Sequence, residues 1–532
     1  MKKILSLALV LAMVFTMSVT AFAADITDGS GSVDITYTYE APADSYIVTI
    51  PDSMAIGMDA TVSATNVAIT AGYLLTVSVS SEQYIEGWKL VNSNDPVGYT
   101  LKIDGADIGN NGTVLTAKNG DSEVTKTLVT ALVGTPKYSG NYTDTLTFSV
   151  SVVECAHNFE NNTCTICGML AYTYDEESNT YTVYSPAGLL AWGEAARTVI
   201  STGTEDTNDD YYAEYTTAMP NLTLAADITL TGENNWTPLG YVSEDESTYY
   251  PYIGTIDGNG HTITGLNINS TGDYIAFVGN LGPNSEVKNL TFKDATIIGG
   301  NNVATVAADC GGNVTNCHVT GSSSVSGQNT VAGVIALNFG IISDCTNAAA
   351  VTVNVGAEST GSGGVVGSNF DGIVMGCFNS GDITGGSDRS QNCGGVVGGN
   401  YGSYTTSSSL IIACGNTGNV ASSAGNAGGI LGNDAYRLPV YACWTKETTE
   451  LKSGTEESSK DGVGADSNQT DVLYACYSFA DTSAVAEAIT AMNTAIEEYN
   501  ASAAEGRKCT YKWQIGTDGY PTLVEIDQTP TE

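Results

Sequence analysis

Gly363-Gly364-Val365-Val366-Gly367 is one of four copies of a glycine-rich apolar block, and the recurrence of this block decides the fold. The other copies are Val331-Ala332-Gly333-Val334-Ile335-Ala336, Gly394-Gly395-Val396-Val397-Gly398 and Gly428-Gly429-Ile430-Leu431-Gly432. Two or three short β-type segments, joined by Gly, Asn and Ser turns, fill each interval. Self-similarity at a period of roughly 20–50 residues is typical of solenoids, whose stacked coils bury a core that one repeat cannot bury alone. The blocks therefore predict a parallel β-helix.

A second repeated mark is an apolar residue followed two or three positions later by cysteine. The cysteines succeed one another at intervals of 28, 32, 37, 29 and 33 residues, and they are Cys317, Cys345, Cys377, Cys414, Cys443 and Cys476. Leu290 stands in the same frame 27 residues before Cys317, so the position accepts a plain hydrophobic side chain. Side chains in register on parallel strands point the same way, which is poor geometry for a disulfide, and a free buried cysteine packs as a small apolar residue. We predict an inward stack of free thiols; disulfides or a ladder of metal ligands are the alternatives.

The segments before and within the array resemble GLUG-type repeats. The resemblance rests on the four blocks together with Leu222–Leu230, Trp236–Gly240 and Gly254–Ile263, which are similar to the opening strands of such β-helices. It covers roughly residues 172–523 and divides them into an opening region at 172–280 and repeats at 281–480. Such proteins resemble surface adhesins or the non-catalytic stalks of larger exported enzymes. Residues 481–526 then predict an amphipathic helix near Ala484–Tyr499 and a capping strand near Trp513–Leu523, because an open last coil presents an unpaired edge.

The first part of the chain has a different pattern. Residues 25–154 alternate apolar and polar side chains, as at Leu75, Val77 and Val79, which predicts half-buried antiparallel strands of a β-sandwich. The stretch Tyr138–Val150 resembles the final hairpin of Ig-like modules on exported bacterial proteins. The fold class expected for the whole chain is all-β: a sandwich, then a parallel β-helix with a small C-terminal helix and capping strand.

A compact group of metal-ligand residues follows the sandwich at 155–168. Cys155-Ala156-His157 is separated by six residues from Cys164-Thr165-Ile166-Cys167. Three thiols and an imidazole at this spacing are typical of a four-coordinate structural zinc site. We predict zinc on Cys155, His157, Cys164 and Cys167, with no open position for catalysis. The alternative is one disulfide with a spare thiol and an uninvolved histidine.

The N-terminus and the charge indicate an exported product. Lys2 and Lys3 precede an apolar run, and Ala21-Phe22-Ala23 forms a signal-peptidase motif, so residues 1–23 are predicted to be a signal peptide. The chain carries 18 Lys and Arg against 58 Asp and Glu, a net charge of −40. This balance disfavours nucleic acid and anionic membranes as partners. The apolar run is too short and too closely followed by the cleavage motif for a membrane span.

Two functions remain open from the sequence. The first is a secreted or cell-surface binding protein, adhesin-like, that presents the β-helix to an extracellular glycan or surface protein. The second is a carbohydrate-active hydrolase that uses a pair of carboxylates on the coils. Its candidates are Asp309, Asp344, Asp371 and Asp382. No lysine or arginine occurs between Lys293 and Arg389, which disfavours a polysaccharide lyase, and neither His261 nor His318 has a motif partner.

Overall fold

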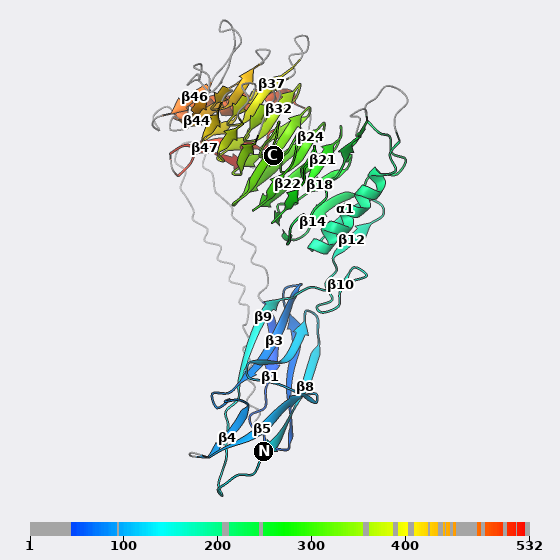
Figure 1. Ribbon diagram of the computed structural model, residues 1–532, viewed down its shortest axis with the longest axis vertical. Helices are drawn as coiled ribbons and strands as arrows, with labels where there is room; N and C mark the ends of the chain where they lie inside the picture. Colours follow the sequence, from blue (N-terminus) through cyan, green and yellow to red (C-terminus); the bar gives the residue numbers. More distant parts are fainter. Residues whose placement is uncertain are drawn as a thin grey trace, which may run out of the picture. The chain divides into compact units, whose positions relative to one another are not determined.

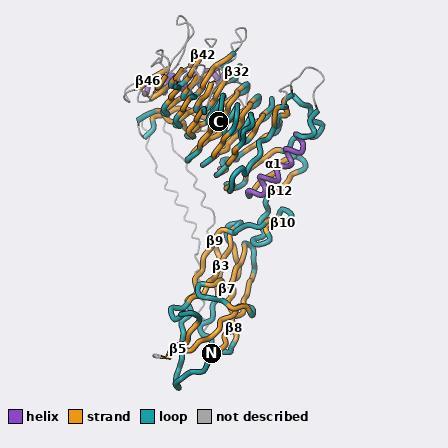
Figure 2. The backbone as a smooth tube through the Cα atoms, viewed as in Figure 1, coloured by secondary structure: helices purple, strands orange, loops and turns teal. Residues whose placement is uncertain are grey.

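The structure is a computed structural model that forms two compact units, Met1–Leu170 and Ala171–Glu532. It describes residues 44–526 except 93–94, 205–211, 244–247, 355–360, 387–391, 403–408, 424–425, 435–439, 442, 447–450, 454–475, 480–484, 504–507 and 518. The predicted signal peptide lies outside the described residues. The chain is mostly β, as predicted, and Figures 1 and 2 show its strands.

The first unit is a β-sandwich of two antiparallel sheets. Its core is formed by alternating side chains such as Val62, Leu75, Val77 and Leu128, all fully buried. One sheet contains β1 (Ser45–Thr49), β2 (Asp59–Ala68), β8 (Glu123–Val133), β5 (Asp95–Ile103) and β4 (Trp88–Asn92), with β6 (Ala106–Asp107) on β5. The other contains β7 (Gly112–Lys118), β3 (Tyr73–Ser80) and β9 (Thr147–Glu154).

The stretch Tyr138–Val150 is a crossover rather than the predicted hairpin. Strand β8 belongs to the six-stranded sheet, whereas β9 pairs antiparallel with β3 in the other sheet. The crossing segment is held by side chains that the alternation pattern does not reveal: the hydroxyl of Tyr99 donates to Asp144 Oδ2 at 2.6 Å. The turn residues therefore bind across the sandwich instead of closing a two-stranded ribbon.

The second unit is a parallel β-solenoid of about six turns, which confirms the predicted fold. A typical coil places one or two strands in a 17-stranded sheet and one strand in each of two further sheets, and three coils add a strand to a small third sheet. The 17-stranded sheet contains β12 (Tyr172–Asp175), β13 (Thr180–Val183), β14 (Asn221–Leu224), β15 (Ile228–Thr229), β18 (Thr255–Asp257), β19 (Thr262–Thr264), β22 (Glu286–Lys293), β25 (Asn313–Thr320), β28 (Ile341–Ser343), β29 (Thr346–Asn347), β33 (Ile373–Met375), β34 (Phe378–Asn379), β38 (Leu410–Ile412), β39 (Gly415–Asn416), β43 (Val440–Tyr441), β44 (Cys443–Lys446) and β46 (Cys476–Phe479).

The remaining coil strands form three smaller parallel sheets. The seven-stranded sheet contains β20 (Asn267–Asn269), β23 (Thr296–Ile298), β26 (Ser324–Gly327), β30 (Ala350–Val353), β35 (Ile383–Gly385), β40 (Val420–Ser422) and β45 (Leu451–Ser453). The six-stranded sheet contains β21 (Val278–Leu281), β24 (Ala307–Cys310), β27 (Ile335–Asn338), β32 (Val366–Phe370), β37 (Val397–Tyr401) and β42 (Leu431–Asp434). The three-stranded sheet contains β31 (Gly361–Gly363), β36 (Asn392–Gly394) and β41 (Asn426–Gly428).

The glycine blocks allow successive coils to approach closely. A Cβ added at Gly364 would lie 2.2 Å from the carbonyl oxygen of Gly395, and one at Gly395 would lie 2.0 Å from that of Gly429. Both distances are far inside van der Waals contact, so this position of the block accepts only glycine without a shift of the backbone. The apolar residues that follow, such as Val365 and Val396, are fully buried in the solenoid core.

The predicted cysteine stack is confirmed for the five cysteines whose side chains the structure describes. They form no disulfide and are fully buried, and they are Cys317, Cys345, Cys377, Cys414 and Cys443. Leu290 pairs in register with Cys317, as the 27-residue offset predicts. The side chain of Cys476 lies outside the described residues, although its backbone pairs in register with Cys443.

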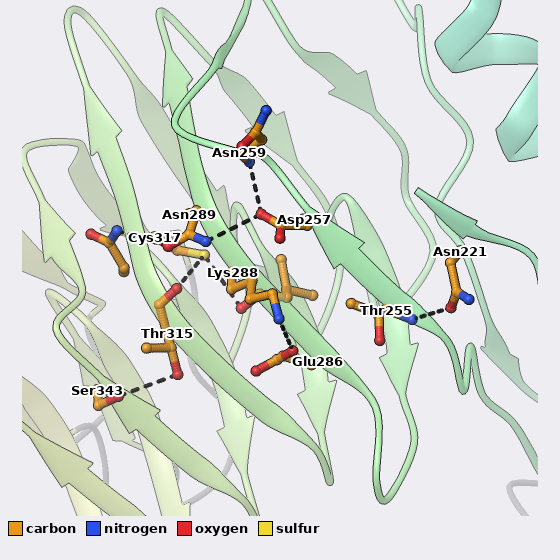
Figure 3. A network of polar contacts seen from close by, with 12 residues as sticks. Asn221, Thr255, Asp257, Asn259, Glu286, Lys288, Asn289, Thr315, Cys317 and Ser343 are labelled. Carbon is orange, nitrogen blue, oxygen red and sulfur yellow. Dashed lines mark hydrogen bonds and ion pairs between the residues drawn. The ribbon is translucent and has the colours of Figure 1, made fainter. Parts of the chain in front are cut away.

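A left-handed residue precedes each stacked side chain on five successive coils. The backbone φ angle is positive at Asn289, Asn316, Asp344, Gly376 and Ala413, with values between 51° and 59°. These residues form a column, which we call the bend column, immediately before Leu290 and the first four cysteines of the stack. Asparagine, aspartate and glycine are the residue types that adopt this conformation most readily. At the first two of these coils the side chains are hydrogen-bonded. Asn289 Nδ2 donates to Asp257 Oδ1 (Figure 3), and Asn316 Nδ2 donates to Asn289 Oδ1.

Helix α1 (Pro186–Ile200) covers the first coil and was not predicted. Ser185 caps it, since its hydroxyl accepts from the backbone N–H of Gly188, and Pro186 occupies the first turn. Trp192 is fully buried and its ring lies 6.2 Å from that of Trp236. The helix thereby covers core that would face solvent at this end of the solenoid (Figure 1).

The C-terminal segment covers the outer face of the 17-stranded sheet. It contains α2 (Val485–Ser502) and the antiparallel pair β47 (Tyr511–Ile515) and β48 (Pro521–Glu525). Trp513 is buried and its indole N–H donates to the carbonyl of Ala413 at 2.8 Å. Among the described residues, β47 pairs with β48 and with no coil strand, so this segment packs on the side of the solenoid.

Candidate metal centre

The three cysteines and the histidine predicted as ligands come together at the end of the first unit. Cys155 follows β9 directly, and its backbone N–H donates to the carbonyl of Gly72. Strands β10 (Phe159–Glu160) and β11 (Thr163–Cys164) then form a small hairpin. Its two loop residues, Asn161 and Asn162, both have positive φ, as a tight two-residue hairpin turn requires.

The ligand atoms form a tight group. The Sγ atoms of Cys155 and Cys164 are 3.9 Å apart, and Cys167 Sγ lies 3.4 Å from His157 Nδ1. All four ligand atoms lie within 4.8 Å of one another. The three cysteines are free and at most 8% exposed. The cluster can therefore bind a metal ion, and its cysteines are not paired in the alternative disulfide.

Local backbone bonds hold the Cys-x-x-Cys turn in place. The N–H of Gly168 donates to the carbonyl of Cys164 at 2.9 Å, and Gly168 itself has a φ of +75°. A side chain at that position would be strained, so the glycine after the second cysteine is required by the turn. The ring of His157 stacks on Phe159 at 5.3 Å, which fixes the direction of the imidazole.

The thiols have opposite tendencies to ionise. Burial raises the pKa of the Cys155 thiol to about 12, and the neighbouring sulfurs of Cys167 and Cys164 add to this effect. Burial also acts to raise the pKa of Cys164, but hydrogen bonds from the backbone of Cys167 and from the His157 side chain outweigh it and lower that pKa to about 5. Without a cation, the cluster favours a thiolate on Cys164 and disfavours further charge on Cys155.

The coil carboxylates considered for a hydrolase are placed differently from one another. Asp344 is fully buried beneath the C-terminal segment, where its Oδ1 accepts from the Cys509 thiol at 2.9 Å and its Oδ2 from the Thr510 N–H at 3.0 Å. Asp309 is 5% exposed, and burial raises its pKa to about 7. Asp371 lies at a left-handed turn position, and Asp382 accepts a hydrogen bond from the backbone of Asn419.

The two solenoid histidines have structural partners. His261 Nδ1 lies 3.2 Å from Asp227 Oδ1. His318 is half-buried, and its ring nitrogens lie 2.9 Å from Thr346 Oγ1 and 2.8 Å from Asn316 Oδ1. Both imidazole rings therefore have polar partners on the surface of the coils.

Comparisons with known proteins find only partial or distant similarity. No protein-family model matches the sequence. Over 111 residues the chain is 35% identical to halomucin from Haloquadratum walsbyi, a match that spans 20% of this chain and 1% of that protein. An IgA1 protease structure aligns over 74% of this chain and 28% of its own, with 12% identity and a TM-score of 0.33. The GLUG-type and Ig-like resemblances consequently stay predictions.

No helix among the described residues is long and apolar enough to cross a membrane.

Proposed function

We propose that this chain is an exported, adhesin-like binding protein that presents its solenoid to glycans or proteins at a cell surface. The observation that carries the proposal is the long parallel solenoid itself, because its stacked coils offer an extended surface on which many small contacts can be made. Repeated weak contacts of this kind suit polymeric or cell-surface targets, where avidity multiplies modest affinities.

The outer face of the first coils supports a polar mode of recognition. Around β18, β22 and β25 it carries Asn, Asp, Thr and Ser side chains joined in a hydrogen-bonded network (Figure 3). Lys288 is paired with Glu286 at 2.6 Å, so its charge is already compensated. A surface of this composition offers donors and acceptors to hydroxyl-rich ligands and little attraction to polyanions. The net charge of −40 and the local likeness to halomucin are consistent with an extracellular setting.

The Cys/His cluster is assigned a structural zinc ion within this proposal. Zn–S bonds near 2.3 Å in a tetrahedron place two sulfurs about 3.8 Å apart, close to the 3.9 Å between Cys155 and Cys164. Bound zinc would stabilise thiolates on all three cysteines and reverse the raised pKa of Cys155. Four protein ligands leave no position for substrate, so the ion's role is to hold the end of the sandwich together.

The experiment is a binding assay of the mature chain on immobilised mucin, plant and microbial polysaccharides, with reducing-end release measured in parallel. We expect retention on at least one surface without release of sugar. Release of reducing ends, lost on changing an accessible coil carboxylate as in Asp382→Asn, would replace the binding function with the hydrolase. Asp344→Asn is unsuitable as the diagnostic change, because Asp344 also holds the C-terminal segment.

A further inference from the structure

A cavity of about 500 Å³ opens near the first coils, between the end of α1 and the two-stranded ribbon of β16 (Tyr241–Val242) and β17 (Tyr249–Tyr250). Its lining includes Arg197 and Ile200 from α1, Pro238 and Tyr241 beside the ribbon, and Asp273 and Tyr274 from the following coil. This volume lies within the range of roughly 300–1,000 Å³ that is usual for small-ligand sites. All of these residues belong to the second unit.

The cation of the pocket is held rigidly. The Arg197 guanidinium lies over the ring of Trp236, 5.3 Å from its centroid, and its Nη1 donates to the carbonyl of Thr237 at 2.9 Å. Its Nη2 lies 3.5 Å from Glu194. Guanidinium has five N–H donors in a fixed plane, so further donors remain for a ligand after these contacts.

The carboxylate of the pocket is equally fixed. Asp273 Oδ1 accepts from the backbone N–H of Asn301 at 2.6 Å, and Oδ2 accepts from the Asn301 side-chain amide at 3.0 Å. Each carboxylate oxygen has a second lone pair for another donor. Asp273 is exposed at the rim, where a ligand hydroxyl can reach it.

An aromatic face completes the set. Tyr241 stacks on Tyr250 with ring centroids 4.6 Å apart and planes 10° from parallel, and Tyr241 is 46% exposed. Ile200 and Pro238 add apolar surface beside it. A ring supported in this way presents a flat apolar surface without losing side-chain freedom on binding.

We propose that this pocket binds the terminal unit of a neutral glycan. The aromatic face would take the apolar C–H face of a pyranose ring, while the planar guanidinium donates to its hydroxyls and Asp273 accepts from them. Anionic sugars and phosphates are disfavoured, because Asp273 and Glu194 place negative charge beside Arg197 and the whole chain is strongly acidic. This inference deepens the proposed function and rests on its glycan-binding form.

The test titrates the full-length mature chain with lactose, cellobiose, mannose and N-acetylglucosamine, and with sialyllactose as the anionic counterpart, by calorimetry. At least one neutral sugar should bind, with sialyllactose at least tenfold weaker than lactose if lactose is bound. Tyr241→Ala and Arg197→Gln should each weaken binding about tenfold or more. The matched control is Phe339→Ala, an exposed aromatic on another coil that stacks on Phe370 at 5.4 Å and should leave affinity unchanged. Melting curves establish that each variant is folded.

The outcomes separate the pocket from the proposed function. Neutral sugars that bind and are lost with Tyr241→Ala support the pocket, whether or not the chain also adheres to a surface. If no neutral sugar binds, or if sugar binding is unchanged in Tyr241→Ala, while the chain still adheres to a surface, the pocket is overturned and the proposed function stands. Loss of sugar binding in Phe339→Ala but not in Tyr241→Ala moves the site to the other aromatic and also overturns it. A chain that binds neither sugars nor surfaces overturns both.

Discussion

Cysteines occur in two regions of the molecule, and their side chains are arranged differently in each. In the solenoid the thiols follow one another coil by coil, and those of Cys317, Cys345, Cys377 and Cys414 donate to the backbone carbonyl two residues earlier, as Cys345 does to Ser343 at 3.1 Å. In the cluster, Cys155, Cys164 and Cys167 converge from a strand end, a hairpin and a turn. Burial raises the pKa of Cys345, whereas that of Cys164 is lowered to about 5. Chain geometry, rather than residue type or burial, therefore decides which cysteines are apolar filling and which converge in a group that can bind a metal ion.

The difference between the two groups of cysteines can be tested by making the same substitution in each group. Cys164→Ser removes a ligand, and zinc should fall from one equivalent to less than about 0.2 per chain, because a site left with three of its four protein ligands competes poorly with a chelator for the ion. Cys345→Ser should retain the full equivalent. Elemental analysis after dialysis against a chelator measures both. Equal zinc contents in the two variants would contradict the assignment of the site.

A second test concerns buried charge in the solenoid. Burial raises the pKa of Asp309 from 3.8 to about 7, so the folded chain binds this proton more tightly than the unfolded chain. Proton binding by Asp309 therefore favours the folded state at low pH, and this contribution to the free energy of unfolding is lost as the pH rises from about 4 through about 7. Asp309→Asn should therefore stabilise the solenoid at pH 8, by on the order of 4 kcal/mol, and flatten this pH dependence.

Thermal unfolding of wild type and Asp309→Asn between pH 4 and pH 8 measures the difference at each pH. Glu487→Gln, on the exposed side of α2, is the matched control and should run parallel to wild type. A wild-type solenoid that is more stable than Asp309→Asn at pH 8 would show that the carboxylate has a stabilising partner instead.

A third test, with the smallest expected change in stability, asks whether the stacked cysteines only fill space in the core. Cys345→Val should change the free energy of unfolding by less than about 1.5 kcal/mol, because valine stays apolar and only modestly larger than cysteine, and the stack accepts the still larger Leu290 one coil before Cys317. Cys345→Ala should be worse, by about 1–2 kcal/mol, because it leaves a cavity. Denaturant midpoints rank the two. If valine proves more damaging than alanine, the thiol has a role beyond filling space.

The features that could be predicted from the sequence were mostly those set by short or regular spacings along the chain. The coil period, the register of Leu290 with Cys317 and the meeting of the four cluster residues all depend on contacts set by short or regular offsets. Helix α1 had a local signal in Ser185-Pro186, but its burial against Trp236 required knowing that a solenoid end lay beside it. The crossover at Tyr138–Val150 was predicted as a hairpin because turn residues alone do not say which sheet comes next.

The bend column was the part least visible in the sequence. Asn289 and Asn316 bond along the column, whereas Asp344 binds Cys509 and Thr510. Gly376 is small where Cys509 approaches: an added Cβ would lie 3.0 Å from its Sγ. These choices depend on a segment that lies far along the chain, so no periodicity within the repeats predicts them.

The attachment of that segment has a consequence for the order of folding. Most pairings in the solenoid join residues about one coil apart, so coils can form successively along the chain. The bonds from Cys509 to Asp344 and from Tyr511 to Asn316 instead span 165 and 195 residues. They can form only after the intervening coils exist. A chain interrupted before Cys509 would leave the Asp344 carboxylate without its hydrogen bonds from Cys509 and Thr510, so the C-terminal segment completes this part of the solenoid last.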